Sequence, residues 1–430
     1  MGTDNYYFQA DPLPANDTEN EREKVNIPIL LVSDSVSSPT GLARITRELA
    51  LRIHANLSDT FEVATCGPGG TWSKKFPFKQ YPVFVQNWTI PELPGVWYDF
   101  AGERKGILFF VWNASWLEWV SDPDILPDGD LKTFLKSDRI EKWIYAPIDG
   151  AGADGKLVKS QAKMFNGFNR VLAYTKFGAN VIDRTCGWLE GTTPYLPHGT
   201  DETVFFPRDR KEARACFIEK VVQKGVGLIA DDILLCGCVA TNTPRKDWGL
   251  AFETCGELLK RGVNVGLWAH TDRFQKAQVW DLLALADEFG MRLRTIFTNG
   301  NLDDDAMSWA YAACDVTLGI GSGEGWGLPN SEALACGVPC ITGDYAGAAE
   351  FTPEAFKIKP AAFRLDGYYC NKRPVFHAKD WADKVIEVVE WMKGKPKIPL
   401  LLQQYAWKNC WPAWEEWLLE GVHGKQESSK

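Results

Sequence analysis

Two glutamates, Glu324 and Glu332, lie eight residues apart in the stretch GIGSGEGWGLPNSEALACGVPC, which spans residues 319–340 and contains six glycines. On one unbroken helix their carboxylates would be separated by about 12 Å along the axis, too far to share a small ligand group. The glycines before Pro329 predict a loop instead, followed by a helix that begins near Pro329 and ends at Gly337. We therefore expect Glu324 in the loop and Glu332 on the helix.

The segment DVTLGI, residues 315–320, reads as a strand that leads into this loop. A strand end, a glycine loop and a helix start form an anion pocket in open α/β sheets, because unpaired backbone N–H groups point at the anion. Phosphate accounts for the glycines but not for the glutamates, since a carboxylate repels a pyrophosphate. A carboxylate that accepts two hydrogen bonds from a vicinal diol is favourable. The expected ligand therefore carries both a diphosphate and sugar hydroxyls, as a nucleotide-sugar does.

A bound diphosphate needs cations. The segment NTPRKDWGLAF, residues 242–252, places Arg245 and Lys246 in a loop between an expected strand and an expected helix of the same half of the chain. These two side chains are the candidates for binding the diphosphate charge. Asn242 begins the same loop and is a further candidate for ligand binding.

Two segments of the first half add candidates. SSPTGLARI, residues 37–45, follows an expected strand, and Gly41 would let the backbone approach a ligand closely. YAPIDGAG, residues 145–152, ends another expected strand. Its Asp149 could accept a hydrogen bond from an acceptor hydroxyl or from the donor sugar, and a turn or helix-capping role is equally compatible with the sequence.

The segment EGWGLPNSEALACGVPCI resembles the E-x7-E signature of the retaining nucleotide-sugar glycosyltransferases of group 1, or family 4, which have the GT-B fold of two Rossmann-like domains. The resemblance implies that Glu324 lies beside the donor sugar and that Glu332 holds the ribose hydroxyls. It also implies that the backbone amides of four loop residues face sugar and phosphate. These residues are Gly325, Trp326, Gly327 and Leu328.

Two other segments carry the same resemblance. NTPRKDW is similar to the family's phosphate-binding motif, in which an Arg precedes a Lys by five residues. Thr241 stands at that Arg position here, so we expect Arg245 to replace it. SSPTGLARI resembles the family's N-terminal glycine loop. LPHGTDETVFFP, residues 196–207, resembles the start of the family's C-terminal domain, where His198 and Asp201 would fix the joint between the domains.

The elements that must position these residues form two α/β series. Strands are expected at IPILLVSD, FEVATCG, GILFFVW, KWIYAPI and RVLAYT in the first series, and at DILLCGCVA, NVGLWAH, MRLRTIF and DVTLGI in the second. Helices are expected between them, including 40–55, 246–261, 274–290 and 303–314. We therefore predict two doubly wound domains facing a cleft, joined by a kinked C-terminal helix. The expected boundaries are 1–26 for an acidic disordered tail, 27–198 and 199–399 for the domains, 400–421 for the crossover helix and 422–430 for a second tail.

Composition limits the class of protein. The net charge of −9 argues against a broad basic face for nucleic acid. Eleven cysteines without a C-x-x-C pair support neither a disulfide framework nor a zinc site. With no leader-like start and no long apolar run, we expect a cytoplasmic protein without a transmembrane segment. The acidic triplet 303–305 is expected to begin a surface helix rather than to bind a metal.

The resemblance implies transfer of a hexosyl-type sugar with retention from a UDP-, GDP- or ADP-linked donor, with no cofactor and no obligatory metal. We expect a carbohydrate or lipid-linked acceptor, bound by a first domain that is rich in tryptophan. Its tryptophans are Trp72, Trp88, Trp97, Trp112, Trp116, Trp119 and Trp143. An exposed tryptophan stacks well on a sugar ring, but the helix-like spacing of Trp112, Trp116 and Trp119 is more typical of core residues. The segment WSKKFPFKQ, residues 72–80, leaves a nucleic-acid acceptor open. A sugar-nucleotide epimerase, a phosphorylase and a non-catalytic nucleotide-sugar binder also remain alternatives.

Overall fold

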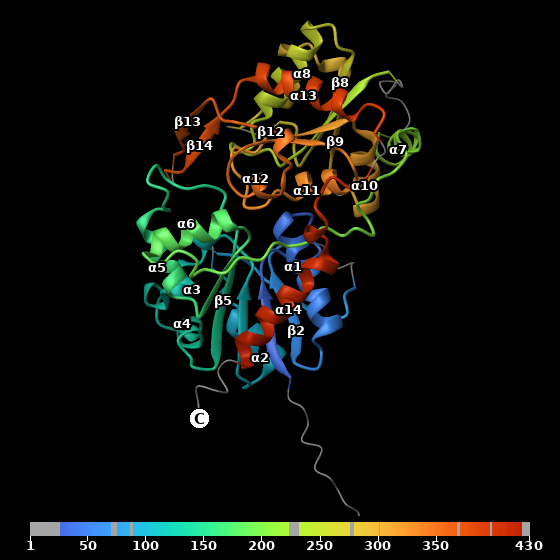
Figure 1. Cartoon of the computed structure of the whole chain (residues 1–430). Helices are drawn as coiled ribbons and strands as arrows, with labels where there is room; N and C mark the ends of the chain where they lie inside the picture. Colours follow the sequence, from blue (N-terminus) through green and yellow to red (C-terminus); the bar gives the residue numbers. More distant parts are fainter. Residues whose placement is uncertain are drawn as a thin grey trace, which may run out of the picture.

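The computed structural model describes residues 26–69, 75–86, 89–222, 232–275, 279–300, 302–367, 370–395 and 398–423. Two α/β halves lie one above the other, each built on a six-stranded sheet (Figure 1). Residues 1–25 and 424–430, where we expect the tails, lie outside the described residues, as do Trp72 and Trp88.

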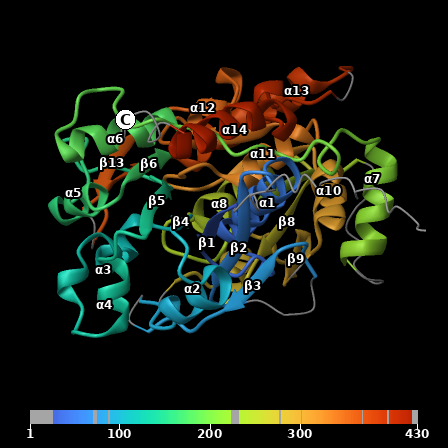
Figure 2. The same ribbon diagram turned by 90° about the horizontal axis from the view of Figure 1, so that it is seen from below.

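The first sheet has the strand order β3-β2-β1-β4-β5-β6, and its strands are parallel. Its β1 is the apolar run IPILLV, of which the last five residues are buried, as a strand between two helix layers requires. The strands are β1 Ile27–Val32, β2 Phe61–Gly67, β3 Lys79–Pro82, β4 Gly106–Phe110, β5 Ile140–Ala146 and β6 Arg170–Ala173. The helices are α1 Gly41–Asn56, α2 Leu93–Ala101, α3 Glu118–Ser121, α4 Asp130–Leu135, α5 Lys159–Asn166 and α6 Lys176–Cys186. Figure 2 shows this half from below.

The second sheet has the order β12-β11-β10-β7-β8-β9, which is the same winding when its strands are counted from β7. The expected fold of two doubly wound domains is confirmed. Its strands are β7 Leu234–Val239, β8 Val265–Thr271, β9 Thr295–Asn299, β10 Val316–Gly319, β11 Cys340–Gly343 and β12 Lys357–Ile358. Its helices are α7 Arg210–Phe217, α8 Trp248–Lys260, α9 Leu282–Glu288, α10 Asp304–Ala313, α11 Leu328–Ala335, α12 Ala348–Phe351 and α13 Ala378–Met392. A hairpin of β13 Ala362–Leu365 and β14 Lys372–Val375 stands apart from the sheet.

Ligands of such folds bind at the carboxyl ends of the strands where the strand order reverses. In the second sheet that point lies between β7 and β10, and in the first sheet between β1 and β4. The loops after β7, β10 and β1 contain the segments with Arg245, Glu324 and Gly41, respectively. The winding therefore brings the candidate segments to the places where a ligand is expected.

The C-terminal helix α14, Trp407–His423, returns to the first half, as expected (Figure 1). Its Trp414 donates from Nε1 to the carbonyl of Pro197 at 2.9 Å, and the carbonyl of Trp417 accepts from Arg170 at 2.6 Å. Trp414 is fully buried in a core that contains residues of both sheets. The helix therefore ties the two halves into one packed unit. No helix in the described part of the chain is long and apolar enough to cross a membrane.

Several expected elements have different bounds. The helix expected over 274–290 is α9, which begins only after Asp281, because that carboxylate caps the backbone N–H groups of Leu283 and Ala284. The strand expected over 291–297 begins at Thr295, after a turn of 3₁₀ helix. The helix expected from residue 400 begins at Trp407, since the preceding backbone pairs with Thr200. Strand β3 and the β13–β14 hairpin were not expected.

Most described tryptophans of the first half are core residues rather than acceptor-binding surfaces. Trp97, Trp112, Trp119 and Trp143 are each at most 3% exposed. Trp116 is half-buried and packs edge-on against Trp112. Trp112 and Trp119 are core residues, as their helix-like spacing indicates, and Trp97 and Trp143 are not exposed for binding an acceptor either. Their bulk fills the layers between sheet and helices.

Candidate active site

The loops after β7 and β10 are paired through their backbones. Lys246 and Gly321 form an isolated antiparallel bridge. The N–H of Ser322 donates to the carbonyl of Arg245 at 2.9 Å, and the N–H of Asp247 donates to the carbonyl of Ile320 at 3.1 Å. This pairing fixes the two basic side chains against the loop that contains Glu324.

Glu324 lies between these two cations. One carboxylate oxygen forms an ion pair with Lys246, and the other lies 2.8 Å from Nη1 of Arg245. Burial opposes the charge of Glu324, but the two cations outweigh it and lower the pKa of this carboxyl to about 2. Glu324 is therefore an anion that is neutralised from two sides at neutral pH. The expected neighbours Arg245, Lys246 and Glu324 are brought together.

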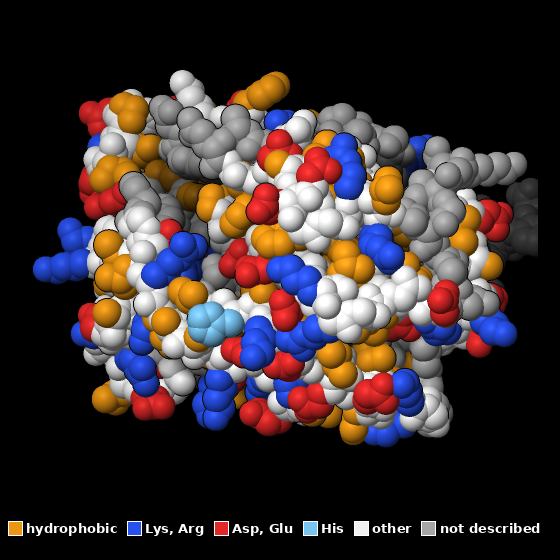
Figure 3. All heavy atoms as spheres, turned by 90° about the horizontal axis from the view of Figure 1, so that it is seen from above, with side chains coloured by type: hydrophobic (Ala, Val, Ile, Leu, Met, Phe, Trp, Pro, Cys, Tyr) orange, Lys and Arg blue, Asp and Glu red, His pale blue; other side chains and the backbone are white. Residues whose placement is uncertain are grey.

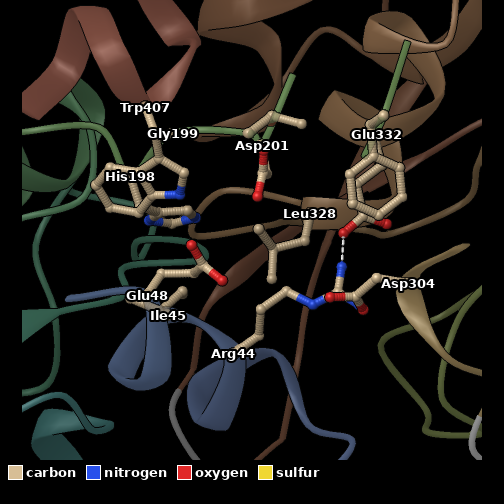
Figure 4. Close-up of a pocket in the computed structure, with 12 residues that line it drawn as sticks. Arg44, Ile45, Glu48, His198, Gly199, Asp201, Asp304, Leu328, Glu332 and Trp407 are labelled. Atoms are coloured by element: carbon tan, nitrogen blue, oxygen red, sulfur yellow. Dashed lines mark hydrogen bonds and ion pairs between the residues drawn. The ribbon is translucent and has the colours of Figure 1, made fainter. Parts of the chain in front are cut away.

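Glu332 lies on α11, which begins at Leu328 after Gly327 in a left-handed conformation, φ 100°. Gly337, φ 72°, follows the end of the helix, as expected. Glu332 is 4% exposed and accepts a hydrogen bond from the Tyr311 hydroxyl at 2.9 Å. Its second oxygen pairs with Arg44 of the first half (Figure 4). Burial raises the pKa of Glu332, and Arg44 opposes that rise.

Arg44 therefore joins the two halves at Glu332. It lies on α1, one turn after Gly41, and also pairs with Asp304 at the start of α10. Gly41 itself faces the second half, since a Cβ atom at this position would lie 3.4 Å from the Leu328 side chain. The acids of residues 303–305 begin α10, as expected, with Asp303 capping the N–H of Ala306.

A pocket lies beside this contact, between α1, α10, α11 and the start of α14 (Figure 4). The imidazole of His198 lines the pocket and is fully buried, and burial lowers its pKa to about 3. Its Nδ1 lies 3.1 Å from the Tyr145 hydroxyl, while its Nε2 has no partner among the described residues. The lining residues are Arg44, Ile45, Glu48, His198, Gly199, Thr200, Asp201, Phe205, Asp304, Leu328, Glu332 and Trp407.

Asp149 lies across the cleft from the second half. Its Oδ2 is 3.2 Å from Nε of Arg245, so it joins the cluster around Glu324. Its other oxygen and its carbonyl accept hydrogen bonds from Arg373 on β14. The carboxylate thus contacts cations rather than capping a helix.

The three remaining candidates, Trp326, Gly325 and Asn242, make contacts within the protein. The indole of Trp326 is buried against His198 and Phe351, so the side chain is not available to a ligand. Gly325 packs against Pro147 of the first half. The side-chain amide of Asn242 donates to two carbonyls of the segment before α9, at 2.8 and 3.0 Å, and thereby fixes that loop.

Sequence reasoning missed Arg44, Tyr311 and Arg373. Arg44 had a usable signal, because it stands one turn after Gly41 on the helix that faces the cleft. No local sequence pattern marks Tyr311 or Arg373, since their neighbours in space are remote in sequence. No group of three or more His, Cys, Asp or Glu side chains arranged to hold a metal ion occurs among the described residues.

Residues 275–390 match the family model for glycosyl transferases group 1. No curated protein matches the chain in sequence.

Solved structures with the same fold include HepE of Anabaena in complex with UDP and glucose, 12% identical with a TM-score of 0.67, covering 92% of this chain and 100% of that one. Sucrose-phosphate synthase of Thermosynechococcus elongatus is 14% identical with a TM-score of 0.63, covering 94% and 100%. WaaG, a glycosyltransferase involved in lipopolysaccharide biosynthesis, is 14% identical with a TM-score of 0.57, covering 84% and 90%. The segment that is similar to the group 1 glycosyl transferases contains both glutamates, and the chain shares the fold of these solved structures.

Proposed function

We propose that the protein transfers a sugar, with retention, from a UDP-linked donor to a hydroxyl of a carbohydrate or lipid-linked acceptor. The observation that carries the proposal is the cluster of Glu324, Arg245 and Lys246 at the point where the second sheet reverses its strand order. The choice of UDP rests on HepE, whose structures hold UDP and UDP-glucose in the same fold.

Each residue has a proposed role. Arg245 and Lys246 bind the diphosphate, and the loop amides from Gly325 to Leu328 bind its remaining oxygens. Glu332 accepts hydrogen bonds from the ribose hydroxyls, and Glu324 lies beside the donor sugar. Gly41 lets the first half approach the donor closely.

The chemistry follows from these charges. As the bond between the sugar and the diphosphate breaks, the electron pair stays on the diphosphate and the sugar becomes oxocarbenium-like. Fixed cations stabilise that departing charge, and they need no reorganisation at the moment of reaction. Glu324, held as an anion, stands where it can stabilise the developing positive charge on the sugar. Positioning of the acceptor hydroxyl next to the sugar supplies the remaining part of the rate enhancement.

A nucleobase acceptor is less well supported by the structure. In the segment expected to contact nucleic acid, Phe76 and Phe78 stack on each other with ring centroids 5.5 Å apart, and Phe78 is 8% exposed. The Phe78 ring is therefore not free to stack on a base. Basic and acidic side chains are also interspersed over the face seen in Figure 3. Residues 72–74 of this segment lie outside the described residues.

A ligand panel tests the proposal. Binding of UDP raises the unfolding temperature by mass action, and GDP and ADP at the same concentration should raise it less. UDP release from UDP-glucose that depends on an added saccharide separates a transferase from an epimerase or a silent binder. NMR of the product reports whether the anomeric configuration is retained. Failure of UDP to bind, or UDP bound away from Glu332 in a crystal, would refute the assignment.

A further inference from the structure

Arg373 belongs to the β13–β14 hairpin and reaches across the cleft to the first half. It is 5% exposed although it carries a charge. Its Nη1 donates to the backbone carbonyl of Asp149 at 2.8 Å, and both terminal nitrogens lie 3.3 Å from Oδ1 of the same residue. Its Nε is held at 3.1 Å by Asp366 of its own hairpin. The guanidinium is therefore fixed at both ends.

Asp149 connects Arg373 to the proposed diphosphate site. Arg373 contacts Oδ1 of Asp149, and Oδ2 of the same carboxylate forms an ion pair with Nε of Arg245 at 3.2 Å. The terminal nitrogen Nη1 of Arg245 lies 2.8 Å from the Glu324 carboxylate. The order of contacts is thus Arg373, Asp149, Arg245, Glu324.

The two loops beside Arg373 leave room for it only because they carry glycines. A Cβ atom at Gly323 would lie 2.7 Å from Nη1 of Arg373, and one at Gly150 would lie 2.9 Å from the same nitrogen. Both distances are too short for real side chains. Gly323 comes from the second half and Gly150 from the first. The backbone on both sides of the cleft is therefore shaped around this guanidinium.

We propose that Arg373 is a positioning residue for sugar transfer, which orients Arg245 through Asp149 without touching the substrate. The inference rests on the proposed function of the Glu324 cluster. Within the cluster, Asp149, Glu324 and Asp366 balance Arg245, Lys246 and Arg373. Removal of Arg373 leaves Asp149 with one cation and adds a net negative charge beside the departing diphosphate. The effect should fall on the chemical step, because the diphosphate-binding cations themselves remain.

The test compares Arg373→Gln with Arg364→Gln. Arg364 is the cross-strand partner of Arg373 and is exposed, so it is a matched control on the same hairpin. Turnover is measured as UDP released from UDP-glucose at saturation, UDP affinity by calorimetry, and folding by thermal unfolding. We expect Arg373→Gln to lower kcat by about 10-fold or more while the Kd for UDP stays within about twofold, and Arg364→Gln to change neither. Arg373→Lys should recover part of kcat.

A double-mutant cycle with Asp149→Asn tests whether Arg373 acts on Arg245 through Asp149. If Arg373 acts through Asp149, the double variant is no slower than the slower single variant, since both remove the same alignment. Losses of kcat that multiply, a normal kcat in Arg373→Gln, or a fall in UDP affinity as large as the fall in kcat would each overturn the inference. If Arg373→Gln does not fold, the same cycle is measured with Arg373→Lys and Asp149→Asn, again by comparing kcat of the two single variants with kcat of the double variant. Absence of UDP binding or turnover in the unmodified protein would instead refute the proposed function.

Discussion

Arg44→Met should tighten the binding of UDP. Arg44 pairs with one oxygen of Glu332, and the Tyr311 hydroxyl donates to the other. If Glu332 binds the ribose hydroxyls, Arg44 must leave that carboxylate before the nucleotide can bind. Methionine keeps most of the length of the side chain but cannot pair with the carboxylate, so the free protein loses the competing interaction.

The expected change in the Kd for UDP follows from the strength of the ion pair between Arg44 and Glu332. Close charge pairs at interfaces couple by about 1.5 to 7 kcal/mol. We take the low end, because Arg44 also pairs with Asp304 and keeps that partner after it leaves Glu332. A gain of about 1.5 kcal/mol corresponds to a Kd for UDP about 10-fold lower. Because burial raises the pKa of Glu332 and Arg44 opposes the rise, loss of Arg44 favours the protonated carboxyl, and the variant should be measured at more than one pH above neutrality.

Calorimetric titration with UDP measures the effect. Arg47→Met is the matched control, since Arg47 lies one turn further along α1 and pairs with Asp304 at 3.4 Å. The control should leave the Kd within about twofold. A Kd for UDP that rises about fivefold or more in Arg44→Met would refute the reasoning, because Arg44 would then bind the nucleotide rather than compete with it.

The other predictions concern the cations, the cleft and the buried histidine. Replacing Arg245 and Lys246 together by Gln should lower the turnover of UDP-glucose by about 100-fold or more, and a near-normal kcat would move the leaving-group role elsewhere. Gly323→Ala should lower both turnover and the unfolding temperature, because φ is +143° and a Cβ atom would overlap the Asp149 carbonyl. Small-angle scattering should then show an opened cleft. Burial lowers the pKa of His198 to about 3, so the unfolded chain alone takes up that proton as the pH falls below about 6.5. Stability should therefore fall by about 2 kcal/mol between pH 6.5 and 5, and urea unfolding of His198→Gln should lack this contribution.

The sequence predicts the elements that local patterns define. The apolar run of β1 and the helical spacing of α1 appear in the structure with nearly the expected bounds. The loop and helix around Glu324 and Glu332 are also as expected, because glycines with positive φ and a proline at a helix start leave little choice. Where a boundary depends on remote partners, the expectation is wrong. The start of α14 is set by the backbone of Thr200, which lies two hundred residues earlier.

The same limit applies to the site. Arg245 and Glu324 could be joined from the sequence, because both follow strands of one doubly wound sheet. Arg373 could not, since it comes from a short hairpin that stands outside the sheet order. The tryptophans show a different limit. The helix-like spacing of Trp112 and Trp119 indicates the core positions that they occupy, but whether Trp97 and Trp143 lie in the core or in the cleft depends on packing that the sequence alone does not specify.

The eight residues between the glutamates separate two electrostatic tasks. Glu324 is neutralised by cations of its own half, whereas Glu332 is neutralised by Arg44 from the other half. Both acids are therefore paired while no ligand is bound, and a buried carboxylate without a partner would be strongly destabilising. In the proposed function, a nucleotide-sugar exchanges these ion pairs for its own groups, the diphosphate against Arg245 and Lys246, and the ribose against Glu332. Both exchanges involve side chains that join the two halves, since Arg245 also pairs with Asp149, and Arg44 keeps its ion pair with Asp304 after it leaves Glu332.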